Sequence, residues 1–189
     1  MQLKVCSVNP DIASHNHLCH IISPLTNPRD IARLKDLITK SEVSWERVIH
    51  LANTYLVISA LWVGLCEKEL DSELENEVRN YLQELHALNL RRNQNLKRQT
   101  IEAIRVLNKK GIVPILIKGA VQFFQPIHGD LGVRIMTDLD ILVPENQIAE
   151  AIKALIQIGY QAYKYPNADL APPHHVAPLM RAGKYGSIE

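Results

Sequence analysis

The first half of the chain has apolar residues at helical spacing. Asn27 followed by Pro28 predicts a helix start, because Asn is a favoured N-cap and Pro is accepted at the first helical position. A second start is predicted at Ser44. Residues 55–65 are apolar nearly all round, which indicates a helix buried inside a bundle. This pattern predicts a helical region over residues 28–111.

The charges in this region change sign along the chain. Residues 67–84 hold seven acidic and two basic side chains, whereas residues 91–110 hold seven basic side chains and one acidic one. We expect two amphipathic helices whose solvated faces pair weakly. A basic face that docks a polyanion is the alternative. Gly111, after two lysines, is typical of the residue that ends a helix.

After Gly111 the pattern favours strands. Residues 112–117 form a short β-branched run, which predicts a buried strand, and Lys118-Gly119 then opens a short helix. Residues 137–143 predict a second strand, and Pro144 starts a helix that Gly159 closes. Further strands are expected over 160–165, 175–179 and 184–189. The fold class is therefore α+β, with a helical bundle before a small mixed-sheet core over residues 112–189.

Residues 1–27 are the least regular part of the sequence, and we expect an irregular N-terminal arm there. They include His15, His17, Cys19 and His20. Such a cluster could bind a metal, but its spacing fits no closed zinc pattern, which favours solvated histidines instead.

Composition excludes several classes of protein. The 189 residues are 47% hydrophobic and 22% charged, which is enough apolar content to form a core. A net charge of +1 argues against broad binding to a nucleic-acid backbone. The sequence has no apolar run long enough for a transmembrane helix and no apolar signal-peptide core. Three widely spaced cysteines form no disulfide framework, and we expect a cytoplasmic protein.

Two short motifs carry the chemistry. Asp138 and Asp140 are two residues apart on a predicted strand, so their carboxylates should lie side by side on one face. Adjacent carboxylates repel each other, and a divalent cation such as Mg²⁺ would offset that cost. A water-exposed strand end is the alternative.

At Lys118-Gly119 a glycine lets the backbone approach a ligand, and a lysine adds positive charge for an anion. A plain turn with an exposed lysine would look the same.

Together these motifs resemble the DNA polymerase β-like nucleotidyltransferase superfamily, and within it a poorly characterised bacterial subgroup. The resemblance lies in residues 116–121 (LIKGAV) and 134–143 (RIMTDLDILV). It extends back to residues 45–52 and forward to His174-His175 and Pro178-Leu179, and so covers about residues 44–189. The two histidines could bind substrate or metal, or could simply be a polar entry to a strand.

The resemblance implies roles for named residues. Asp138 and Asp140 would bind metal, with Glu189 as the third catalytic carboxylate, and Gly119 would face the nucleotide phosphates. Lys118 and Arg134 would be positive groups near the triphosphate. The usual Gly-Ser or Gly-Gly turn of the superfamily is Gly119-Ala120 here.

The implied activity is transfer of a nucleoside monophosphate from a nucleoside triphosphate to an acceptor hydroxyl. Two Mg²⁺ (or Mn²⁺) ions would assist in-line attack at the α-phosphorus. The acceptor, whether protein, small molecule or RNA, is left open. The alternatives are a weakly active or inactive nucleotide-binding or regulatory module, and a scaffold that binds a protein through its helical region. Because Glu189 closes the sequence, we expect the core to be truncated at its C-terminus.

Overall fold

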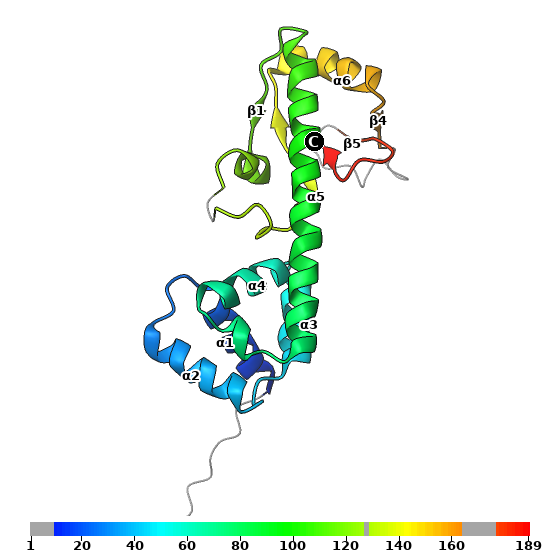
Figure 1. Cartoon of the computed structure of the whole chain (residues 1–189). Helices are drawn as coiled ribbons and strands as arrows, with labels where there is room; N and C mark the ends of the chain where they lie inside the picture. Colours follow the sequence, from blue (N-terminus) through cyan, green and yellow to red (C-terminus); the bar gives the residue numbers. More distant parts are fainter. Residues whose placement is uncertain (1–9, 127–128, 164–176) are drawn as a thin grey trace, which may run out of the picture. The chain divides into compact units, whose positions relative to one another are not determined.

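The computed structural model describes residues 10–126, 129–163 and 177–189 (Figure 1). Its contacts divide the chain into two compact units. The first unit comprises the residues up to Asn89 together with Gly132–Ile135, and the second comprises Leu90–Leu131 and Met136–Glu189. The division falls within the longest helix, whereas the sequence pattern places a boundary after that helix, at residues 111–112.

The first unit is built from helices. Its elements are α1 (Pro10–Ile22), α2 (Pro28–Thr39), α3 (Trp45–Thr54), α4 (Ile58–Glu67), a 3₁₀ turn η1 (Asp71–Glu73) and the first part of α5 (Asn76–Asn108). Buried leucines, isoleucines and valines from all four short helices form one core with Leu82 of α5.

Two predicted helix starts agree with the structure. The side chain of Asn27 accepts hydrogen bonds from the backbone N–H groups of Arg29 and Asp30, which caps α2. Ser44 precedes α3, but its side chain makes no cap hydrogen bond.

The prediction of an irregular arm over residues 1–27 is wrong for residues 10–22, which form α1. Ser14, Leu18 and Ile21 are buried at helical spacing, so one narrow stripe of α1 packs in the core. A Cβ at Gly64 of α4 would overlap the carbonyl oxygen of Ile21, so α1 and α4 approach as closely as they do because that residue is glycine.

Two further helix predictions need correction. The helix expected over residues 55–65 begins only at Ile58, and Tyr55 and Leu56 are exposed in the preceding turn. The prediction of separate acidic and basic helices is wrong, because residues 76–108 form one helix of 33 residues. The sequence contains no Pro or Gly between these bounds, so nothing interrupts the backbone hydrogen bonds.

The second unit is mixed, as predicted. After the end of α5 it contains β1 (Ile115–Leu116), the 3₁₀ helix η2 (Lys118–Phe123), β2 (Asp138–Leu139), β3 (Ile141–Leu142), η3 (Glu145–Gln147), α6 (Ile148–Gln157), β4 (Gln161–Ala162), β5 (Leu179–Met180) and β6 (Ser187–Ile188). Gly111 and Gly159 follow α5 and α6 in the left-handed region, as their spacing predicts.

The strands are shorter than predicted and pair in two small sheets. β1 pairs antiparallel with β3, and the second sheet has the order β2-β6-β5-β4, with β2 and β6 parallel. The prediction of a buried strand over residues 112–117 is wrong, because Val113 and Ile115 are exposed and, among the described strands, β1 pairs with β3 alone.

The core of this unit joins Leu96 and Leu107 of α5 to Leu139, Leu155 and Ile188. His174 and His175 lie outside the described residues. Within the described part of the chain, the helices are all too short or too polar to cross a membrane.

Candidate functional site

Strand pairing brings three carboxylates together. β2 and β6 are parallel, with Asp138 opposite Ser187 and Leu139 opposite Ile188. The pairing continues for one more residue: Glu189 N–H donates to the carbonyl of Leu139 at 3.0 Å, and Ile141 N–H donates to the carbonyl of Glu189 at 2.9 Å. Alternate residues of a strand share a face, so Asp138, Asp140 and Glu189 lie on the same side of the sheet.

The three side chains are close enough to share an ion. One carboxylate oxygen from each of Asp138, Asp140 and Glu189 lies within 4.8 Å of the others. Asp140 is buried at 5% exposure, and the other two are partly buried. Like charges held this close in a partly desolvated place repel each other, and a divalent cation removes that cost. Carboxylate oxygens are the donors that Mg²⁺ and Mn²⁺ prefer, so this donor set fits such an ion.

A lysine supplies part of the balancing charge. Lys118 Nζ lies 2.5 Å from Asp140 Oδ1. This hydrogen bond is the main reason that the pKa of Lys118 is raised, and the negative charges of Asp140, Asp138 and Glu189 add to it. Three carboxylates and one ammonium group still leave two negative charges, which matches one divalent ion.

In the Lys118-Gly119 turn, the residue with a left-handed backbone is the lysine and not the glycine. Lys118 itself has φ +49°, in the left-handed region that a side chain makes costly. Gly119 is buried in η2 and does not have a positive φ. Ala120 N–H donates to the carbonyl of Ile117, so that amide is used within the turn. Contact of Gly119 with phosphates stays a prediction.

Arg134 lies in the segment that belongs to the first unit. There Asn89 Nδ2 donates to the carbonyls of Gly132 and Arg134, at 2.7 and 3.1 Å, and Ser59 Oγ donates to that of Gly132 at 2.6 Å. The structure therefore gathers Lys118 with the three carboxylates, whereas the role of Arg134 near a triphosphate stays a prediction.

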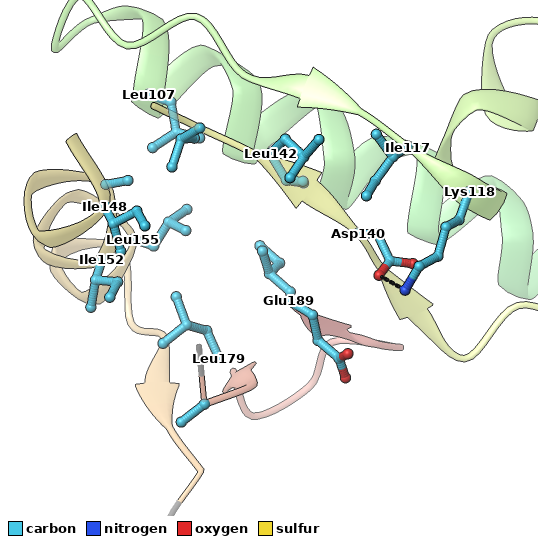
Figure 2. Close-up of a pocket in the computed structure, with 15 residues that line it drawn as sticks. Leu107, Ile117, Lys118, Asp140, Leu142, Ile148, Ile152, Leu155, Leu179 and Glu189 are labelled. Carbon is cyan, nitrogen blue, oxygen red and sulfur yellow. Dashed lines mark hydrogen bonds and ion pairs between the residues drawn. The ribbon is translucent and has the colours of Figure 1, made fainter. Parts of the chain in front are cut away.

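A cavity of about 240 Å³ adjoins the carboxylates, and sequence reasoning missed it (Figure 2). Its polar lining is Lys118, Asp140 and Glu189, and the rest of its lining is apolar. The spacing of Ile148, Ile152, Leu155 and Ile156 predicts one apolar helix face, of which the first three line the cavity and Ile156 is exposed. This spacing carries no signal for the space that such a face leaves against neighbouring elements.

The N-terminal histidines form no comparable cluster. His15 Nδ1 is 2.8 Å from the Asp11 carbonyl, and its Nε2 is 3.3 Å from the Tyr55 hydroxyl. Among the described residues, only Asp138, Asp140 and Glu189 form a group of three or more side chains that could hold a metal.

Comparison with known proteins places the chain in a family. Neither the curated proteins nor the solved structures contain a significant match. A family model described as uncharacterised nucleotidyltransferase matches residues 41–185. The match includes Lys118, Gly119, Arg134, Asp138 and Asp140 and ends before Glu189. Since it covers well over half of the sequence, the chain belongs to this uncharacterised nucleotidyltransferase family.

Proposed function

We propose that the second unit transfers a nucleoside monophosphate from a nucleoside triphosphate to an acceptor hydroxyl, with help from a divalent metal. The observation that carries the proposal is the meeting of Asp138, Asp140 and Glu189 within 4.8 Å, beside Lys118. A protein that only needed a stable sheet would gain nothing from three repelling carboxylates at one place. Membership of a nucleotidyltransferase family supports the same activity.

The carboxylates would hold the metal. Asp138 and Asp140 offer carboxylate oxygens from one segment, and Glu189 offers them from the segment paired with it. A metal ion would therefore have oxygen ligands from both segments. When bound, Mg²⁺ or Mn²⁺ supplies the positive charge that a triphosphate and a reacting α-phosphorus require.

Lys118 would bind a phosphate. Its side chain is 54% exposed although it pairs with Asp140, so its ammonium group can turn toward a ligand. A lysine is a compact positive charge that suits a phosphate oxygen. Once a metal neutralises Asp140, we expect Lys118 to exchange that carboxylate for the triphosphate.

Glu189 would accept the proton of the acceptor. The hydroxyl oxygen attacks the α-phosphorus and forms a new P–O bond, while its proton passes to the carboxylate of Glu189. The bond between the α-phosphorus and its bridging oxygen to the β-phosphorus breaks, and pyrophosphate leaves with that electron pair. The proton then passes from Glu189 to solvent.

Calorimetry tests the binding step. We expect the protein to bind a non-hydrolysable nucleoside triphosphate analogue in the presence of Mg²⁺ or Mn²⁺, and the panel should include all four bases. Asp138→Asn and Asp140→Asn should each abolish metal-dependent binding, because an amide replaces a charged ligand. Glu145→Gln, an exposed change in the same unit, is the matched control.

Circular dichroism of each variant would show whether the fold is kept. Unchanged affinity in folded Asp138→Asn and Asp140→Asn would overturn the site. Nucleotide binding without pyrophosphate release, tested with a panel of hydroxyl acceptors, would instead favour a binding module.

A further inference from the structure

The cavity beside the carboxylates is apolar along most of its walls. Leu107 of α5, Ile148, Ile152 and Leu155 of α6, Leu179 of β5 and Ile188 of β6 line it. Figure 2 shows Leu107, the α6 side chains and Leu179 toward one end, and Lys118, Asp140 and Glu189 toward the other. A ligand in this place would therefore have one apolar part and one polar part.

Two of the three carboxylates lie at the polar end of the cavity. Asp140 and Glu189 line it, but Asp138 does not. In the proposed reaction Glu189 takes the proton from the acceptor hydroxyl. An acceptor seated in the cavity would place its hydroxyl at Glu189, and the opposite side of the carboxylate group, at Asp138, would remain for the triphosphate.

The chemistry of the walls selects against a nucleobase. A base needs hydrogen-bond partners at its edges, and binding sites for polar ligands place a few such groups in their walls. Apart from Lys118, Asp140 and Glu189, every lining side chain of this cavity is apolar. None of these side chains could hydrogen-bond to the polar edges of a base, which disfavours its binding there.

The volume limits the size of the apolar part. An apolar cavity of roughly 150 Å³ holds a benzene molecule, and pockets for drug-sized ligands start near 300 Å³. At about 240 Å³, this cavity suits one ring or a short branched aliphatic group.

We propose that the cavity is the acceptor site, and that the acceptor is a small alcohol whose apolar group, one ring or a short aliphatic chain, fills it. This inference rests on the proposed function, because it assigns the acceptor of that reaction. The triphosphate then binds outside the cavity, so acceptor and nucleotide are held at the same time.

Methyl NMR tests the proposal with benzyl alcohol as the probe. In protein labelled at Ile, Leu and Val methyl groups, we expect benzyl alcohol to shift the resonances of Leu107, Ile152 and Leu155. Glycerol, which has hydroxyls but no apolar group, should shift none of them. Addition of the nucleotide analogue with Mg²⁺ should leave benzyl alcohol bound.

Variants locate the probe. Ala151→Leu adds volume to the lining and should weaken the probe at least about tenfold. Ala151 is buried, and a larger side chain there also strains its packing, so Leu142→Gln is the second variant: Leu142 lines the cavity but is 51% exposed. It should also weaken the probe. Ile156→Gln is the control. Ile156 lies on α6 with Ala151, is 47% exposed and does not line the cavity, so this change should leave the affinity for benzyl alcohol unchanged.

Three results would overturn the proposal. The first is that benzyl alcohol causes no methyl shifts in the cavity. The second is displacement of benzyl alcohol by the nucleotide, which would make the cavity a base pocket. The third is methyl shifts that follow protein concentration, since a second copy would then occupy the cavity.

These results are distinguishable from a failure of the proposed function. Binding of benzyl alcohol requires neither metal nor nucleotide. The proposed function is contradicted by a different result, unchanged nucleotide affinity in Asp138→Asn and Asp140→Asn.

Discussion

The main chain of Glu189 is bonded on both sides of Asp140. Its N–H donates to the carbonyl of Leu139, and its carbonyl accepts from the N–H of Ile141. Asp140 is therefore the strand neighbour of Glu189, and the pairing register alone sets their carboxylates next to each other. The main chain that carries the third carboxylate of the candidate site is thus fixed by two backbone hydrogen bonds.

The first prediction concerns this third carboxylate. Glu189→Gln should lower the affinity for Mn²⁺ by roughly tenfold, because a neutral amide oxygen replaces a charged donor while the strand pairing is kept. The paramagnetic resonance of free Mn²⁺ measures this directly. Ser187→Ala is the control, since its hydroxyl lies 3.4 Å from Glu189 Oε1 but carries no charge, and it should change the affinity much less. Equal Mn²⁺ affinities of the wild type and Glu189→Gln would show that Glu189 is not a metal ligand.

The second prediction separates the backbone of Lys118 from its charge. Lys118→Gly and Lys118→Ala both remove the ammonium group beside Asp140, so both should weaken nucleotide binding alike. They differ at the backbone, because φ is +49° and glycine accepts this region without a crowded Cβ. The glycine variant should be more stable than the alanine variant by about 0.5–1 kcal/mol, measured by urea unfolding.

A glycine variant that is no more stable than the alanine variant would contradict this account. If the order is as expected, the native lysine holds a costly conformation at the position where its charge meets Asp140. Conformations of this kind are found where function needs a particular side chain.

The features that could be predicted from the sequence are those set by neighbouring residues. Asn27-Pro28 begins α2, Gly111 and Gly159 follow α5 and α6, and the two-residue spacing of Asp138 and Asp140 puts both on one face. Each depends on a local backbone preference or on strand alternation, which short segments of sequence carry.

The features that could not be predicted depend on distant partners. Helix α1 mixes apolar and polar residues without a clear apolar face, and its buried residues are explained only by their packing against α3 and α4. Glu189 entered the candidate site through the family resemblance, since no spacing in the sequence pairs β6 with β2. The cavity depends on volumes left between α5, α6 and the strands, for which hydrophobic periodicity has no signal.

The third prediction concerns pH and the attachment of the hairpin β5–β6, which carries Glu189, to helix α5. Glu102 of α5 lies 2.9 Å from Arg181 and 2.8 Å from Lys184 in this hairpin. Its hydrogen bond from Lys184, and then that from Arg181, lower the pKa of Glu102. A carboxyl group whose pKa is lower in the folded state stabilises the fold above its unfolded pKa, and this contribution is lost as the pH falls through the folded value.

Glu102→Gln should therefore destabilise the protein at neutral pH. It should change little in acid well below the lowered pKa of the wild-type carboxyl, where that group is itself protonated. Because the three side chains are about one-third exposed, solvent screening limits the loss at neutral pH to about 0.5 kcal/mol. Urea unfolding of both proteins at the two pH values measures it, with Glu150→Gln, an exposed change on α6, as the control. A difference that persisted in acid would show that Glu102 acts through packing and not through its charge.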